Sequence, residues 1–245
     1  MKAHHLFNDP ECDGEPVEPE PPTQRSDTVD RPPSELEATD DLQPPKPKKI
    51  KVKLADGKER TIDHMMSTTF WGADGKPMSA EQFLHSLYGE LPQLFKDEVE
   101  LRRLWSDPAT RKQLLFALAE KGYGRDMLLE MQRLIDAENS DLYDVLAYVA
   151  FETPKKTRVE RAAYAKQAVN SQLSYGQQQF IDFVLSHYIS VGVEELDQEK
   201  LKPLLDLKYH HSTADALAEL GRPEEIGRLF VGFQQHLYAE NVARP

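Results

Sequence analysis

Five basic side chains lie between positions 155 and 166, and they are the strongest candidates for binding chemistry in the chain. They are Lys155, Lys156, Arg158, Arg161 and Lys166. Pro154 marks the start of this segment, and Arg158 and Arg161 are three residues apart, so both should face one side of a helix. Such side chains can contact phosphate groups or an acidic protein surface. The alternative interpretation is that these charges form only a solvated face. Exposed charges usually contribute little free energy to protein stability.

Two further sets of basic residues could extend or replace this contact. The first set consists of Arg102, Arg103, Arg111 and Lys112. The second set consists of Lys46, Lys48, Lys49, Lys51 and Lys53. The second set resembles a nuclear-import tract, but its lysines alternate with Ile50, Val52 and Leu54. That alternation favours the solvent-facing side of a β-strand.

The acidic residues and histidines give no clear metal site. Ser140, Asp141 and Asp144 could suggest an acidic site, although helix capping and stabilisation of the first helical turn explain them equally well. His210 and His211 are adjacent, so on a helix they would point about 100° apart and could not easily share one ion. The remaining candidates, His4, His5 and Cys12, have no second cluster near them in the sequence. We therefore expect no metal site and interpret the histidine pair as loop residues.

The sequence also argues against catalysis that depends on nucleotides. A phosphate-binding loop needs the pattern GxxxxGK followed by Ser or Thr. The Gly57-Lys58 and Gly75-Lys76 pairs lack both the earlier glycine and the hydroxyl residue. We expect no cofactor, no ATP hydrolysis and no DNA cleavage from this chain alone.

Charge is distributed unevenly along the 245 residues. Residues 1–45 contain twelve acidic and three basic residues, a charge of −9, whereas the whole chain has a formal net charge of −12. The other 200 residues therefore carry only −3, so the acidic composition does not exclude nucleic-acid contact. The single cysteine fits a reducing cytoplasm. The lack of a long apolar run predicts no membrane span.

The elements that would position these side chains follow from local patterns. Residues 1–45 are rich in Pro, Asp and Glu, which predicts a disordered acidic linker. Residues 46–78 should form a small β-hairpin region, because Lys49–Leu54 alternates in polarity and Asp56-Gly57 supplies a turn. A second turn is expected at Asp74-Gly75. Residues 79–245 should form a helical bundle, so the fold class is mainly α, with a multi-helix domain preceded by a hairpin and a disordered tail.

Helix starts and stops are marked throughout residues 79–245. The expected N-terminal capping or starting residues are Ser79, Asp97, Asp107 with Pro108, Asp126, Ser140, Ser174, Asp197, Ser212 and Pro223. Gly122, Gly192 and Gly221 should end helices. The segment from Leu142 to Phe151 is apolar on most sides and should be buried. In the last helix Phe230 and Phe233 favour core packing over a docking face.

Seven segments of the sequence resemble a known family. In chain order they are KIKVKLADGKER (49–60), DGKPMSAEQFL (74–84), LFKDEVELRRLWSDPATRKQLL (94–115), SDLYDVLAYVAFETPKKTRVER (140–161), FIDFVLSHYISVGVEELD (180–197), LLDLKYHHSTADALAELG (204–221) and LFVGFQQHLY (229–238). Together they resemble the C-terminal helical domain of the R subunit of type I restriction enzymes, the EcoEI-like class. The resemblance covers roughly residues 46–240, and none of the segments is a catalytic signature.

The resemblance implies a place in a larger machine. In intact R subunits a nuclease and a DNA-translocating motor precede the helical domain, and ATP and Mg²⁺ belong to those parts. The implied partners are the methyltransferase and specificity subunits of a type I restriction–modification complex. That complex modifies host DNA and cleaves unmodified DNA after ATP-driven translocation.

Three hypotheses for function remain open at this point. The first is a non-catalytic module that docks the motor and nuclease onto the methyltransferase core. The second is a helical module that contacts the backbone of duplex DNA, which would bind with steep salt dependence and little sequence preference. The third and weakest is a free-standing regulator derived from a truncated gene.

Overall fold

The computed structural model describes residues 48–63, 70–72 and 75–239. The expected disordered linker, residues 1–45, lies outside these described residues. Strands β1 (Lys49–Lys53) and β2 (Glu59–Asp63) pair antiparallel, as predicted, with Val52 opposite Arg60. Gly57 has a φ of +81°, a left-handed conformation that glycine adopts without strain. Val52 is buried while Lys49, Lys51 and Lys53 are exposed, which confirms that these lysines form the outer face of the hairpin.

A second, smaller hairpin follows the first. Strands β3 (Phe70–Trp71) and β4 (Pro77–Met78) pair antiparallel around a tight turn in which the Gly72 N–H donates to the Lys76 carbonyl at 2.8 Å. Gly75 has a φ of +74°, as the turn requires. Asp74, predicted to share this turn, lies outside the described residues. The expected single hairpin region thus contains two hairpins.

Helices make up most of the described chain after residue 79. They are α1 (Ala80–Glu90), α2 (Glu98–Ser106), α3 (Pro108–Glu120), α4 (Arg125–Leu134), α5 (Leu142–Phe151), α6 (Arg158–Val169), α7 (Tyr175–Val191), α8 (Leu201–Lys208), α9 (Thr213–Leu220), α10 (Pro223–Gly232) and α11 (Gln234–Leu237). Short 3₁₀ turns occur at Leu91–Gln93, Asn170–Gln172, Val193–Leu196 and Gln198–Lys200. The mainly α fold class is confirmed.

Most predicted helix starts are confirmed by side-chain caps. The side chains of Ser79, Asp97, Asp107, Ser174 and Ser212 each accept a backbone N–H in the first turn of the helix that follows. Each such cap satisfies a donor that the helix geometry leaves without an intrahelical partner.

Five predicted boundaries are wrong. Asp141 rather than Ser140 precedes α5, and α4 begins at Arg125 after Gly124, one residue before Asp126. The helix expected to begin among Lys155 and Lys156 instead begins after Thr157, whose hydroxyl caps it. Asp197 is followed by a 3₁₀ turn, because its carboxylate binds Arg111. The final predicted helix is interrupted at Phe233, between α10 and α11.

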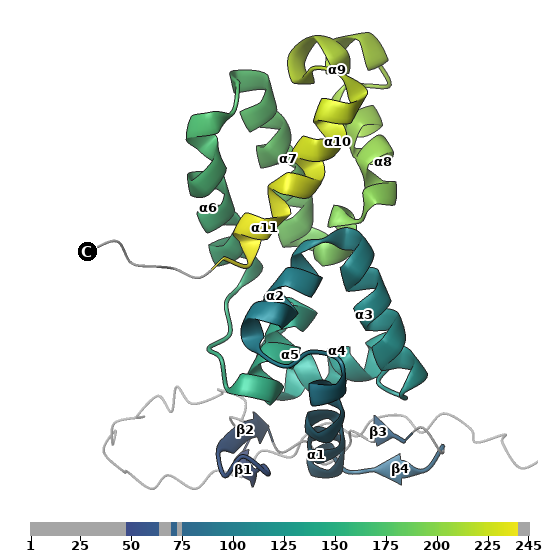
Figure 1. Ribbon diagram of the computed structural model, residues 1–245, viewed down its shortest axis with the longest axis vertical. Coiled ribbons are helices and arrows are strands. Elements are labelled where there is room, and N and C mark those ends of the chain that lie inside the picture. The colour runs from purple at the N-terminus through teal and green to yellow at the C-terminus, as the bar shows by residue number, and fades with distance from the viewer. Residues whose placement is uncertain (1–47, 64–69, 73–74, 240–245) are drawn as a thin grey trace, which may run out of the picture. The chain divides into compact units, whose positions relative to one another are not determined.

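Helix α5 lies at the centre of the packing, and every residue from Leu142 to Val149 except Tyr148 is buried, as predicted. It packs against α1, α2 and α4. Helices α6 and α7 run side by side, and α11 contacts both α6 and α2, so the end of the chain joins helices that are distant in sequence (Figure 1). No helix within the described residues is long and apolar enough to cross a membrane.

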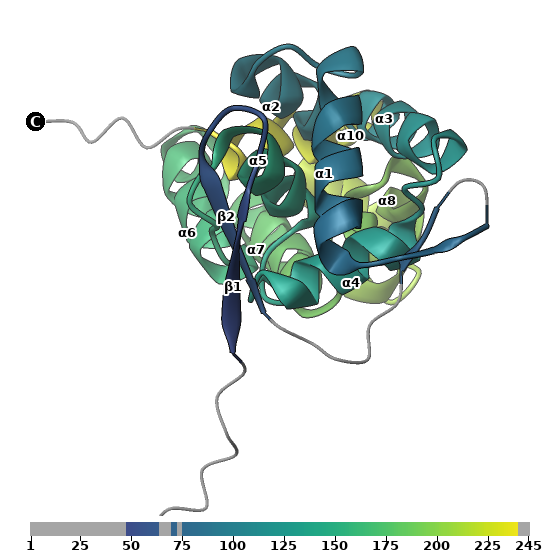
Figure 2. The same ribbon diagram turned by 90° about the horizontal axis from the view of Figure 1, so that it is seen from below.

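The β1–β2 hairpin lies beside α5 (Figure 2), and the buried Arg60 side chain helps to fasten it to the C-terminal end of that helix. The Arg60 Nε donates to the carbonyls of Tyr148 at 2.8 Å and Val149 at 3.2 Å. Its Nη2 also donates to Val149 and to Asp56 at 3.0 Å. A guanidinium is well suited to this place, because the last carbonyls of a helix have no intrahelical donors and carry partial negative charge.

Candidate interaction surface at the α5–α6 junction

The connection from α5 to α6 carries the predicted basic cluster. Helix α5 ends at Glu152, whose φ of +63° turns the chain out of the helix ahead of Pro154. The segment then runs extended past Ser140, with which Thr157 forms an isolated β-bridge. The Lys156 backbone N–H donates to the Asp144 Oδ1 at 2.9 Å. The connection is therefore fixed by hydrogen bonds close to the start of α6.

Arg161 points into the protein rather than to its surface. Its side chain is 4% exposed and its Nη2 lies 2.6 Å from the Oδ1 of Asp144, which is 2% exposed. Its Nη1 donates to the Leu237 carbonyl at 3.0 Å, at the end of α11. The guanidinium lies 4.9 Å from the ring centroids of both Tyr143 and Tyr238. Burial disfavours the charged form, but Asp144 outweighs it and raises the pKa of Arg161.

A second buried carboxylate lies beside this pair. The Asp141 Oδ2 accepts hydrogen bonds from the hydroxyls of Tyr188 at 2.5 Å and Tyr238 at 2.7 Å. Burial raises the pKa of Asp141, although both tyrosine hydroxyls and Arg161 act in the opposite direction. Burial likewise raises the pKa of Tyr188 and Tyr238 well above its ordinary value.

We call Asp141, Asp144, Arg161, Tyr188 and Tyr238 the polar hub. It joins α5, α6 and α7 to the residues at the end of α11. Asp141 is separated in sequence by 47 residues from Tyr188 and by 97 from Tyr238. The sequence pattern supplied only the capping role of the two aspartates, because nothing in the local spacing indicated tyrosine partners so far away.

The other predicted contact residues are scattered rather than gathered into one patch. Arg158 is half-buried and donates to the carbonyls of Ser140 at 2.6 Å and Ile189 at 3.1 Å. Lys155 donates to the Ile135 carbonyl, and burial lowers its pKa. Lys166 is exposed and pairs with Asp182 at 2.7 Å.

The spacing of Arg158 and Arg161 does not make both available at the surface, because Arg161 is buried. Arg161 is turned inward by the buried carboxylate of Asp144, and Arg158 is held by backbone carbonyls. Lys156 is half-buried, with its Nζ 5.7 Å from the ring centroid of Tyr164. The role of Lys155, Lys156, Arg158 and Lys166 as contacts for a partner or DNA stays a prediction.

Arg111, one of the additional basic residues, is also structural. It is 1% exposed, and its Nη2 binds the Asp197 Oδ1 at 2.8 Å. Its Nη1 donates to the Trp105 carbonyl and to the Gln234 Oε1, both at 3.2 Å. It thus joins α3 to α11, and only Arg102, Arg103 and Lys112 of that set reach the surface.

Several hollows lie on the surface of the described residues. An apolar hollow of about 390 Å³ lies between α8, α9 and α10 and includes Leu201, Leu205, Leu217 and Ile226. Two others, of about 480 and 830 Å³, lie along α2. Within the described part of the chain, no three His, Cys, Asp or Glu side chains are grouped so that they could hold a metal ion. His210 and His211 lie in the turn between α8 and α9, as predicted.

One comparison with known proteins is informative. The chain matches the family described as EcoEI R protein C-terminal over residues 81–238. The match therefore includes α2 to α11, most of α1 and the whole polar hub, and it begins after the two hairpins. No curated protein and no solved structure is similar enough to the chain to count as a match.

Proposed function

Because the chain belongs to the EcoEI R protein C-terminal family, and so is a C-terminal part of a type I restriction enzyme R subunit, we propose that it is an assembly module. In this proposal the helical domain docks the motor and nuclease of the R subunit onto the methyltransferase core. The single observation that carries the proposal is the family match over residues 81–238.

The proposal assigns no chemical step to this chain. The Gly57-Lys58 and Gly75-Lys76 pairs lack the remaining residues of a phosphate-binding loop. ATP and Mg²⁺ then act in the motor and nuclease, and the methyltransferase and specificity subunits are the partners. A rigid helical module suits this task, because a flexible connection would transmit the force of the motor poorly.

The packing supports a module of this kind. The polar hub and the Arg111 contacts both fasten the C-terminal residues to helices much earlier in the chain. Such long-range polar contacts, fully buried and mutually satisfied, help to specify one arrangement of the helices. A surface built on these helices would keep its shape while a partner binds.

Size-exclusion chromatography with light scattering tests the proposal directly. The 28.0 kDa chain would be run alone, with the cognate methyltransferase core, and with the core plus its specificity subunit. We expect a complex whose mass is the sum of its components. Separate peaks at micromolar concentrations would overturn the docking proposal.

The competing function is contact with duplex DNA, and the exposed lysines of β1 are the observation that favours it. Lys49, Lys51 and Lys53 all face solvent, although Lys49 pairs with Asp136 and Lys51 lies 3.1 Å from Glu59. A titration with duplex DNA at several salt concentrations separates the two functions. Phosphate contact predicts an affinity that falls steeply as salt rises.

A further inference from the structure

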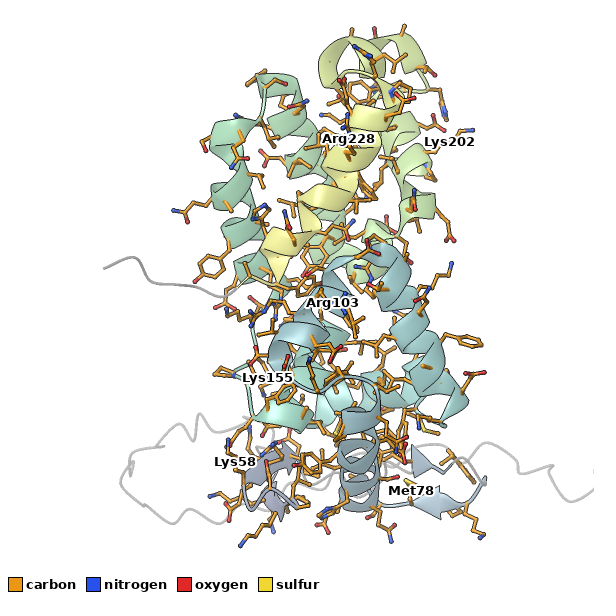
Figure 3. All side chains as sticks on the ribbon, viewed as in Figure 1. Lys58, Met78, Arg103, Lys155, Lys202 and Arg228 are labelled. Carbon is orange, nitrogen blue, oxygen red and sulfur yellow. The ribbon has the colours of Figure 1, made fainter. Side chains whose placement is uncertain are left out.

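The two hollows along α2 share Arg102 and Ala239 among their lining residues, so they lie next to each other, and we treat them as one groove. We call it the α2 groove. One end is lined by the α5–α6 connection, including Lys156, and the other by α10 and α11, including Val231 and His236. Arg103 of α2 also lines the groove (Figure 3).

The lining of the α2 groove contains more cations than carboxylates, although residues 46–245 as a whole carry a net negative charge. Its cations are Arg102, Arg103 and Lys156, with Arg161 at its floor. Residues 46–245 as a whole carry −3. The Arg103 side chain is 70% exposed, and its nearest carboxylate, that of Glu100, is 3.9 Å away, beyond hydrogen-bonding distance. Arg103 can therefore turn toward an incoming anion.

The two carboxylates that line the groove already accept hydrogen bonds from groups of this protein. The Glu98 Oε1 accepts from Arg102 at 3.1 Å, and its Oε2 accepts from the Thr153 hydroxyl at 3.0 Å. The Asp107 carboxylate caps α3 by accepting from the backbone N–H groups of Ala109 and Thr110. Both carboxylates would repel a partner with many closely spaced negative charges. Neither prevents single carboxylates of a partner from reaching Arg103 or Lys156.

The groove also offers apolar surface. Val99 lies on the same face of α2 as Arg103, one helical turn earlier, and is 65% exposed. Val231 and Ala239 line the opposite wall. A phosphate backbone gains nothing from such surface, whereas a peptide side chain would bury it.

We propose that the α2 groove binds an acidic polypeptide segment that also carries an apolar side chain, contributed by the methyltransferase core. This inference rests on the proposed docking function and names its surface and the chemistry of its partner. Carboxylates of the segment bind Arg103 and Lys156, and an apolar side chain between them covers Val99. Arginine suits the first contact, because its guanidinium can bind a carboxylate through two parallel hydrogen bonds.

The test uses four variants of the full chain in two matched pairs. Arg103→Glu reverses a charge in the groove, and Lys202→Glu makes the same kind of change on α8 (Figure 3). Val99→Ser removes apolar surface from the groove, and Val159→Ser removes it from α6, where Val159 is 58% exposed. Thermal unfolding of each variant first establishes that the fold is retained.

The dissociation constant of the methyltransferase core, measured without DNA, gives the result. We expect Arg103→Glu to weaken binding about tenfold or more and to slow association most at low salt. Val99→Ser should weaken it by about threefold or more, and both controls should stay within about twofold of wild type. If both groove variants bind the core as tightly as wild type, the proposal that the α2 groove is the docking surface is wrong, while the docking function itself stands. Absence of wild-type binding would instead overturn the docking function itself.

Two further measurements separate the classes of partner. If Arg103→Glu lowers affinity for duplex DNA but not for the core, the groove binds phosphate and the proposal is wrong. A photo-crosslinking amino acid at position 99 then identifies the occupant by mass spectrometry. A crosslinked core peptide rich in Asp and Glu supports the proposal, and a basic peptide contradicts it.

Discussion

Replacing Arg161 by methionine should destabilise the whole helical domain, because Arg161 neutralises a carboxylate that water cannot reach. Asp144 is 2% exposed. Without Arg161 its remaining donors are the backbone N–H groups of Lys156 at 2.9 Å and Asp141 at 3.2 Å. Methionine keeps most of the contact with Tyr143 and Tyr238, so the change isolates the loss of charge and hydrogen bonds.

The expected cost follows from the burial of both partners. Removing one member of a buried ion pair typically costs about 3–5 kcal/mol, because the other charge is left without compensation. For a domain of this size each kcal/mol lowers the melting temperature by about 2–4 °C. Arg161→Met should therefore lower it by about 6–20 °C. Arg161→Met combined with Asp144→Asn should cost less than the sum of the two single changes.

Urea unfolding followed by circular dichroism measures this cost, and an exposed ion pair between α6 and α7 provides the control. Lys166 and Asp182 are 51% and 43% exposed, so Lys166→Met should cost less than about 1 kcal/mol. The reasoning is refuted if Arg161→Met is no more destabilising than Lys166→Met. If binding to the methyltransferase core were lost at unchanged stability, Arg161 would be a surface contact after all.

Three further predictions concern the other buried polar groups. Burial raises the pKa of Asp141, so the native state holds this proton more tightly than the unfolded chain does. The free energy of unfolding should therefore fall as pH rises from about 4 through the raised pKa. Asp141→Asn, which can still accept hydrogen bonds from both tyrosine hydroxyls, should flatten this fall in urea titrations at several pH values. The pKa values of Tyr188 and Tyr238 are raised in the native state, so above about pH 10 these tyrosines ionise in the unfolded chain before they ionise in the folded protein, and stability should fall. Tyrosinate absorbance should show these two residues ionising only on unfolding. Arg60→Ala should release the β1–β2 hairpin from α5, and hydrogen exchange should accelerate in residues 49–63 while α7 stays protected.

Local signals in the sequence predicted the helices well, because capping is local chemistry. The N–H groups that donate hydrogen bonds to the side chains of Ser79, Asp97 and Asp107 lie within three residues of each cap. No distant part of the chain is needed to recognise these caps. The same holds for the hairpin turn at Asp56-Gly57. The errors arose where a distant partner competes, as at Asp197, whose carboxylate binds Arg111 86 residues away.

The candidate site could not be predicted in the same way. Arg158 and Arg161 have the spacing of an exposed basic face, and spacing does not reveal that Asp144, 17 residues earlier, takes Arg161 inside. A capping aspartate and a surface arginine are each ordinary in a sequence. Only the tertiary fold brings them together, and with them Tyr188 and Tyr238.

The polar hub and the α2 groove are parts of one arrangement, and this gives their variants different signatures. Arg161 and Tyr238 line the groove and also hold Asp144 and Asp141. The hub therefore sets the position of α11, which in turn forms one wall of the groove. Changes in the hub should lower stability and core binding together, because they move that wall. Changes at Arg103 should lower core binding alone, because its side chain is 70% exposed and forms no close ion pair that the fold needs.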